Sequence, residues 1–131
     1  QRQMCIRDRL CTAVPSTGLI DVTNRSKNPM VGKTLPLSHE LFDFAETIFD
    51  VLESRQVTLS KKGEDKGVRL SFEGFPYLIV WSKPEGDFVA VEPWGGLSTC
   101  SDEDDVLEHK RGCLIAKPKE TIVRSFTIEI L

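Results

Sequence analysis

The sequence has few cysteines, and their spacing argues against the usual cysteine-based sites. The four residues, Cys5, Cys11, Cys100 and Cys113, include no Cys-x-x-Cys pair. This spacing disfavours both a disulfide framework and a thiolate zinc site. We therefore expect reduced, partly buried thiols, as in a cytoplasmic protein.

Long apolar runs and an excess of positive charge are also missing. No stretch of 18 apolar residues occurs, so no membrane span is expected. The chain has 17 basic and 20 acidic residues, a net charge of −3. This mildly acidic balance favours neither a nucleic acid nor an anionic membrane as a partner.

Several catalytic motifs are absent as well. No Ser or Cys lies in the glycine-rich elbow that exposes a catalytic nucleophile. The acidic segment 101–105 lacks the glycine and the terminal glutamate of a calcium-binding loop, so we expect it to be a solvated loop. Paired metal ligands are not found either. We therefore expect no metal site.

The first nine residues, QRQMCIRDR, resemble the in-frame translation of a transposase sequencing adapter. As a natural N-terminal arm they would place a Met-Cys-Ile island between charges, with no helical or strand period. We therefore set residues 1–9 aside as an adapter-derived scar. In consequence, we expect residues 10–131 to be part of a longer domain whose gene was truncated at its 5′ end.

Alternation of polar and apolar residues, interrupted by turn signals, predicts an all-β fold. Residues 56–60 and 68–73 flank a charged turn and predict a half-buried antiparallel hairpin. The apolar run 77–81 predicts a central strand covered on both faces, with Trp81 in the core, and 88–91 should pair with it. This pattern is typical of an antiparallel β-sandwich. Other expected elements are short extended segments at 18–20, 34–37, 47–49 and 113–116, a long strand at 121–131, a loop at 24–29, and one helical turn near Ser38 to Phe44.

Glu92 stands out because of its neighbours Pro93 and Trp94. Pro93 has no N–H with which to continue a strand ladder, so the strand is expected to end at Glu92, where a sheet meets its loops. A carboxylate there, with Trp94 beside it, fits a base next to a sugar-stacking platform. The alternative is a strand end with a solvated acid and a tryptophan packed in the core.

The surrounding motifs resemble a known family. Residues 76–84 read PYLIVWSKP and residues 88–96 read FVAVEPWGG, preceded by LPLSHELF at 35–42 and SRQVTL at 54–59. This ordered set resembles the aldose 1-epimerase (galactose mutarotase-like) family, in its LacX-like branch, from about Gly18 to the end. The resemblance implies that residues 10–131 are the C-terminal portion of one β-supersandwich domain, roughly twice this length.

The resemblance also implies a chemistry, mutarotation of an aldohexose without a cofactor. A base removes the proton of the anomeric hydroxyl, an acid protonates the ring oxygen, and the opened ring closes on the other face of the carbonyl. Glu92 matches the family's general base. No match is found for the family's histidine acid or its substrate-binding arginine, and neither His39 nor His109 lies in that motif. The fragment itself is therefore expected to be inactive.

The resemblance implies two sugar-binding residues. Glu46 matches a position where the family usually has an aspartate that holds a sugar hydroxyl, and the alternative for Glu46 is an exposed loop acid. Trp94 could stack on a pyranose or pack in the core. A non-catalytic carbohydrate-binding β-sandwich and a structural β-domain remain rival interpretations. The sequence does not decide which aldose is bound, or whether it is phosphorylated.

Overall fold

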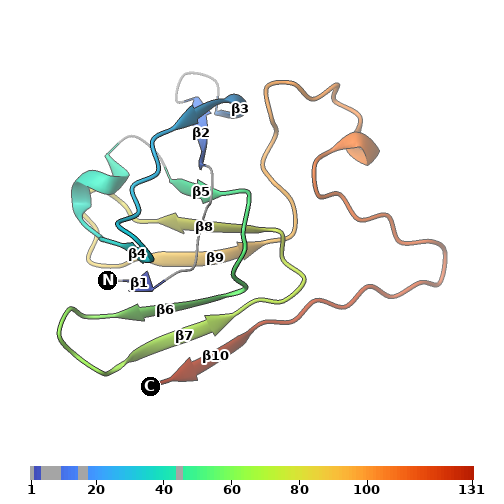
Figure 1. Cartoon of the computed structure of the whole chain (residues 1–131). Helices are drawn as coiled ribbons and strands as arrows, with labels where there is room; N and C mark the ends of the chain where they lie inside the picture. Colours follow the sequence, from blue (N-terminus) through green and yellow to red (C-terminus); the bar gives the residue numbers. More distant parts are fainter. Residues whose placement is uncertain (1, 4–9, 15–17, 44–45) are drawn as a thin grey trace.

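The computed structural model describes residues 2–3, 10–14, 18–43 and 46–131. They form two five-stranded antiparallel sheets, with strand orders β10-β7-β6-β1-β4 and β3-β2-β5-β8-β9 (Figure 1). The all-β prediction is confirmed. The strands are β1 (Arg2–Gln3), β2 (Leu10–Val14), β3 (Leu19–Ser26), β4 (Thr34–Leu35), β5 (Thr47–Phe49), β6 (Gln56–Ser60), β7 (Gly67–Ser71), β8 (Tyr77–Trp81), β9 (Ala90–Trp94) and β10 (Thr127–Ile130), with 3₁₀ turns η1 (His39–Phe42) and η2 (Leu107–His109).

The main core lies between the two sheets. Because side chains alternate across a strand, β8 sends Leu78 and Val80 into this core while Ile79 points to the opposite face. Phe49 of β5 joins the same core, opposite residues of β6 and β7 from the other sheet. The buried set is Leu35, Phe42, Phe49, Val57, Leu70, Phe72, Leu78 and Val80. Burial of these apolar groups is what holds the sheets together.

A second, smaller cluster covers the other side of the β8 sheet, which we call the outer face. It contains Ile20, Ile48, Ile79, Leu97 and Cys100. Residues 97–101 run from the end of β9 to β3, where the N–H of Ile20 donates to the carbonyl of Thr99 (2.9 Å) and the N–H of Ser101 donates to the carbonyl of Ile20 (2.9 Å). The central strand is therefore covered on both faces, as predicted.

The sequence correctly located the strands with the clearest patterns. β6 and β8 have the predicted bounds, and β6 pairs with β7 in the predicted antiparallel hairpin. β5 and η1 also lie where they were expected. Phe44, the end of the predicted helical turn, lies outside the described residues. Of residues 1–9, only Arg2 and Gln3 are described, as β1, so the adapter interpretation stays a prediction.

Two strand predictions at the C-terminal end were wrong. Residues 113–116 form no strand, and within 121–131 only Thr127–Ile130 do so. Pro118 and the left-handed backbone of Lys119 (φ 68°) interrupt the segment between them. An extended segment forms a β-strand only where its backbone pairs with another strand. Residues 127–130 pair with β7 in this way.

Three further details differ from prediction. Trp81 was predicted to be core, but it is 38% exposed, because it ends β8 beyond the buried centre of the sheet. β3 extends to Ser26, into the predicted loop, because it pairs with β2 as far as Leu10. β9 continues through Pro93 to Trp94, since an edge strand has one side that needs no ladder hydrogen bonds.

Candidate functional site

Glu92 and Trp94 lie on the outer face of β9, the edge strand of its sheet. They are two residues apart and therefore point the same way, while Val91 packs against the core between the sheets. The indole Nε1 of Trp94 donates a hydrogen bond of 2.9 Å to Oε2 of Glu92. Both side chains are half-buried. The local strand geometry therefore joins the two residues that the sequence had singled out.

The two oxygens of the Glu92 carboxylate differ in their contacts. Within the described part of the chain, Oε1 of Glu92 receives no hydrogen bond, whereas Oε2 is held by Trp94. A carboxylate fixed through one oxygen keeps lone pairs on the other for an incoming hydroxyl. This geometry suits a proton acceptor.

Trp94 also packs in the smaller core, the alternative that the sequence left open. Its ring contacts the outer-face cluster around Ile79 and Leu97. Tyr77, which is opposite Trp94 in the β8–β9 register, packs against the same cluster. Trp94 therefore links the Glu92 carboxylate to rigid apolar packing.

Glu46 lies two strands away from Glu92. It directly precedes β5, where Thr47 pairs with Val80 and Ile48 with Ile79, and Ile79 in turn pairs with Glu92. Continuing this register by one residue sets Glu46 opposite Trp81. Strand spacing then separates the Cα atoms of Glu46 and Glu92 by about 12 Å. The two carboxylates are on the same sheet but do not contact each other.

The sequence reasoning missed an exposed pair of aromatic residues at the β8–β9 turn. Trp81 and Phe88 flank the β8–β9 turn with ring centroids 5.5 Å apart and an interplanar angle of 61°. Both rings are exposed, Trp81 by 38% and Phe88 by 51%. The sequence pattern gave no sign of this exposure, because β8 reads as uniformly apolar.

The segment after β9 is held by three pairs of acidic and basic side chains, where the sequence predicted a solvated acidic loop. Three successive acids meet three successive basic residues in antiparallel order, and their N···O distances are 2.6, 3.0 and 2.7 Å. The pairs are Asp102 with Arg111, Glu103 with Lys110, and Asp104 with His109. The sequence signal was the matching order of acids at 102–104 and bases at 109–111.

These contacts change the acidity of the carboxyl groups. The hydrogen bond from Arg111 holds the pKa of Asp102 below its usual value. Burial raises the pKa of Glu103, but the hydrogen bond from Lys110 and further polar contacts outweigh it, so the net pKa is lowered. His109 lowers the pKa of Asp104 by hydrogen bonding. These contacts therefore tie residues 102–104 to residues 109–111.

The chemistry of a thiol nucleophile or a metal finds no support in the described residues. Burial raises the pKa of the Cys100 thiol, which disfavours the reactive thiolate. Searching those residues for three or more clustered His, Cys, Asp or Glu gives no candidate metal group. Across the same part of the chain, none of the helices has the length and apolar character needed to traverse a bilayer.

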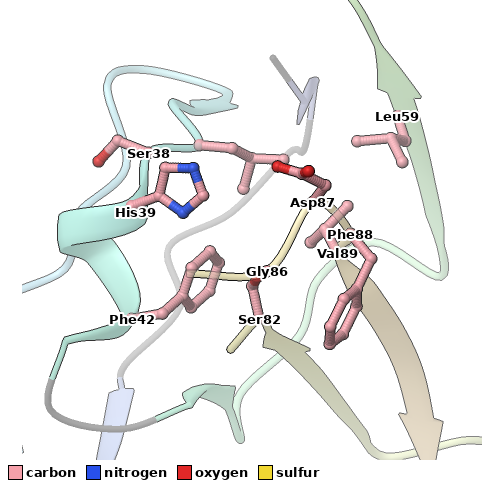
Figure 2. Close-up of a pocket in the computed structure, with 10 residues that line it drawn as sticks. Ser38, His39, Phe42, Leu59, Ser82, Gly86, Asp87, Phe88 and Val89 are labelled. Atoms are coloured by element: carbon pink, nitrogen blue, oxygen red, sulfur yellow. The ribbon is translucent and has the colours of Figure 1, made fainter. Parts of the chain in front are cut away.

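A hollow of about 540 Å³ lies at the opposite end of β9, around the β8–β9 turn (Figure 2). Ser38, His39, Ser82 and Asp87 provide its polar lining, and Phe42 and Phe88 its aromatic lining. Figure 2 shows His39 on η1 and Asp87 on the turn, which face the hollow from different segments. Glu92, Trp94 and Glu46 are not among its lining residues. His39 and the predicted base therefore belong to different places in the fold.

Comparison with known proteins agrees with this architecture. No protein-family model matches the sequence. The chain is 40% identical over 118 residues to the plasmid and chromosomal LacX proteins of Lactococcus lactis subsp. lactis. The match covers 89% of this chain and 40% of each LacX protein, so the chain spans about two fifths of the length of these relatives.

Two solved structures share the fold. A galactose mutarotase related enzyme from Lactobacillus acidophilus superposes with a TM-score of 0.81 at 26% identity, over 99% of this chain and 44% of that one. A galactose mutarotase-like protein from Lactobacillus casei gives 0.61 at 27% identity, over 73% and 34%. The resemblance predicted from residues 76–84 and 88–96 is confirmed. The chain is therefore a LacX homologue with a galactose mutarotase-like fold.

Proposed function

We propose that this chain carries the general-base part of an aldose 1-epimerase site, with Glu92 as the base. The observation that carries the proposal is the hydrogen bond from Trp94 to one oxygen of Glu92, which leaves the other oxygen without a donor in the described residues. The kinship with LacX and the galactose mutarotase-like structures supports the same chemistry. The activity belongs to a protein of LacX length that contains these residues.

In the proposed reaction, Glu92 accepts the proton of the anomeric hydroxyl as the ring opens. After rotation about the C1–C2 bond, Glu92 returns the proton as the ring closes to the other anomer. The ring oxygen needs a separate acid. His109 is engaged by Asp104, and His39 lines a different hollow, so neither is assigned this role. The acid is proposed to be a residue of the LacX-length protein that is not part of this chain.

Substrate contact is proposed for Glu46 and Trp94. Glu46 would accept a hydrogen bond from a sugar hydroxyl on the same sheet face, about 12 Å from Glu92 between Cα atoms. The half-buried indole of Trp94 would border the ring, in addition to positioning Glu92. A cytoplasmic location is proposed on the reduced cysteines.

The test is a Glu92→Gln substitution in a protein of LacX length. The amide keeps the shape and can still accept the Trp94 hydrogen bond, but it cannot take the anomeric proton as a carboxylate does. Turnover is expected to fall by about 10²- to 10⁴-fold, with a much smaller change in KM. Polarimetry of freshly dissolved α-galactose or α-glucose measures this, after subtraction of the spontaneous rate. Near-parental turnover would remove Glu92 from the mechanism.

The exposed Trp81–Phe88 pair favours a second candidate function, carbohydrate binding without catalysis. Exposed aromatic rings offer a stacking surface to the apolar face of a pyranose. The two functions separate in one experiment. If the protein of LacX length is only a binder, it should bind galactose without catalysing mutarotation. The Trp81→Ala variant of that protein should then lose its affinity for galactose.

A further inference from the structure

Arg124 differs from every other arginine whose side chain the structure describes. Each of the others has a hydrogen-bonded partner, and none of the N–H donors of Arg124 has one among the described residues. Its Nη1 atom is also shielded from solvent. The paired arginines are Arg25 with Asp50, Arg55 with the carbonyls of Leu52 and Ser54, Arg69 with Glu129, and Arg111 with Asp102.

The position of Arg124 is nevertheless well defined. Its guanidinium carbon lies 5.4 Å from the centroid of the Phe75 ring, in cation–π range. On another side, Nη1 packs so closely on Gly95 that a Cβ atom there would approach it to 2.9 Å. Gly95 directly follows Trp94, so the turn after β9 makes room for the guanidinium. A held but unpaired cation costs free energy unless an anion compensates it.

A hollow of about 350 Å³ adjoins this guanidinium. Two of its lining residues are arginines, Arg55 and Arg124, and no lining residue is acidic. The partners of Arg55 are backbone carbonyls, at 2.7 and 3.3 Å from Nη1, which leave its positive charge without a counter-charge. The remaining lining comes from the β7–β8 turn at 74–76 and from residues 112–114. The hollow therefore holds two positive charges and no negative one.

We propose that this hollow binds an oxyanion, a phosphate or carboxylate group, through Arg55 and Arg124. The planar guanidinium fork suits these anions, because its N–H groups match two oxygens at once. The hollow is distinct from the candidate site, because Glu92, Trp94 and Glu46 are not among its lining residues. The proposal is therefore independent of the proposed mutarotase function.

The experiment is a titration of the 131-residue chain with inorganic phosphate at constant ionic strength. Isothermal titration calorimetry measures the binding, and thermal melting measures Tm at each phosphate concentration. Saturable binding and a rise of Tm with phosphate are expected, because a ligand of the folded state stabilises it by mass action. Parallel titrations with acetate and with a hexose 6-phosphate distinguish a carboxylate, a free phosphate and a phosphorylated sugar as the preferred source. Absence of saturable binding for all three overturns the proposal.

Variants locate the site. Arg124→Met should weaken binding by about 10- to 100-fold, the loss expected for charge-assisted hydrogen bonds. Arg124→Lys keeps the charge without the fork and should bind with intermediate affinity, which also covers the case in which Arg124→Met fails to fold. Arg69→Met is the matched control, because Arg69 lies on β7 paired with Glu129 and does not line the hollow. Equal weakening in Arg69→Met would overturn the proposal.

A further experiment tests whether Arg124 pairs instead with a carboxylate from the additional residues of a protein of LacX length. The same phosphate titration in a protein of LacX length should again show saturable stabilisation that depends on Arg124. Loss of binding there, with Arg124 intact, would overturn the proposal in favour of an internal ion pair.

Discussion

The indole N–H of Trp94 donates a 2.9 Å hydrogen bond to the carboxylate of Glu92, its neighbour two residues earlier on the same face of β9. The hydrogen bond has a fixed direction because the rest of the indole ring is packed. The ring contacts the small outer-face core around Ile79 and Leu97, so its N–H is aimed by rigid packing. A predicted base is thereby oriented by a predicted platform residue, a relation that their shared motif does not indicate by itself.

Replacement of Trp94 by Phe should separate packing from positioning. Phe retains an aromatic ring for the outer-face core but lacks the N–H donor. In a protein of LacX length we expect kcat to fall, by about tenfold, with KM nearly unchanged, because the base loses its orientation and not its substrate contacts. Polarimetry at several sugar concentrations measures both constants.

The matched control for Trp94→Phe is Tyr77→Phe, which lies opposite Trp94 and keeps the ring in the same core. It should leave the Glu92 carboxylate and kcat largely unaffected. If both variants lower kcat equally, the effect comes from packing, and the positioning role of Trp94 is wrong.

How far the sequence predicted the fold depended on whether local pattern and tertiary pairing agree. Residues 56–60 and 77–81 gave the right bounds because their alternation or continuous apolarity reflects the faces they bury. Residues 113–116 and 121–126 gave the wrong ones, because strand-forming residues such as Ile115 and Ile122 have no neighbouring strand among the described residues.

The sequence indicated which residues to consider for the candidate site, but not how they are arranged. Glu92 and Trp94 came from a motif, and their spacing of two implies a shared strand face. The sequence could not reveal the exposure of Trp81, which depends on where the sheet ends. Nor could it reveal the unpaired state of Arg124, which lies against Gly95 although the two are far apart in the sequence. Such long-range relations are set by tertiary packing.

Asp102 and Glu103 should titrate in ways that identify their partners. In the folded chain the pKa of Asp102 is expected below 3.8, because Arg111 stabilises the carboxylate. A depressed pKa in the folded state contributes stability above the unfolded pKa, and this contribution is lost as the pH falls through the folded value. Carboxyl ¹³C chemical shifts measured against pH report each group directly.

Substitution of each base should affect its own acid. Arg111→Gln should return the pKa of Asp102 toward 3.8 and leave Glu103 almost unchanged. Lys110→Gln should raise the pKa of Glu103 from its lowered value, because burial is then opposed by fewer compensating contacts. High salt should diminish the Asp102 effect, since this pair is exposed. A common response of both acids to either substitution would contradict the paired arrangement.

Exposed apolar side chains near the C-terminal end should make the isolated chain prone to association. Val123 is 80% exposed and Ile130 78%, and β10 forms one edge of its sheet. Unpaired edges with apolar side chains promote pairing between molecules. Size-exclusion chromatography should show concentration-dependent oligomers, reduced in an Ile130→Lys variant. The control Ile79→Lys, at a buried position, should unfold the chain instead. A monodisperse monomer at all concentrations would contradict the prediction.

Gly112 should be far less tolerant of a side chain than Gly63, although both have left-handed backbone, with φ of +74° and +81°. A Cβ at Gly63 would meet no atom within 4 Å, so Gly63→Ala should cost only the backbone strain, about 1 kcal/mol.

At Gly112 the same Cβ would lie 2.8 Å from the carbonyl oxygen of Gly95 and 3.0 Å from the Tyr77 ring. Backbone cannot yield as a flexible side chain does, so Gly112→Ala should cost about 2–4 kcal/mol in total. Urea denaturation followed by circular dichroism compares the two variants. Because Gly95 directly follows Trp94, Gly112→Ala should also alter tryptophan fluorescence before unfolding, and Gly63→Ala should not. Equal stability losses in the two variants would mean that the close approach of residue 112 to the β9 turn does not exist in solution.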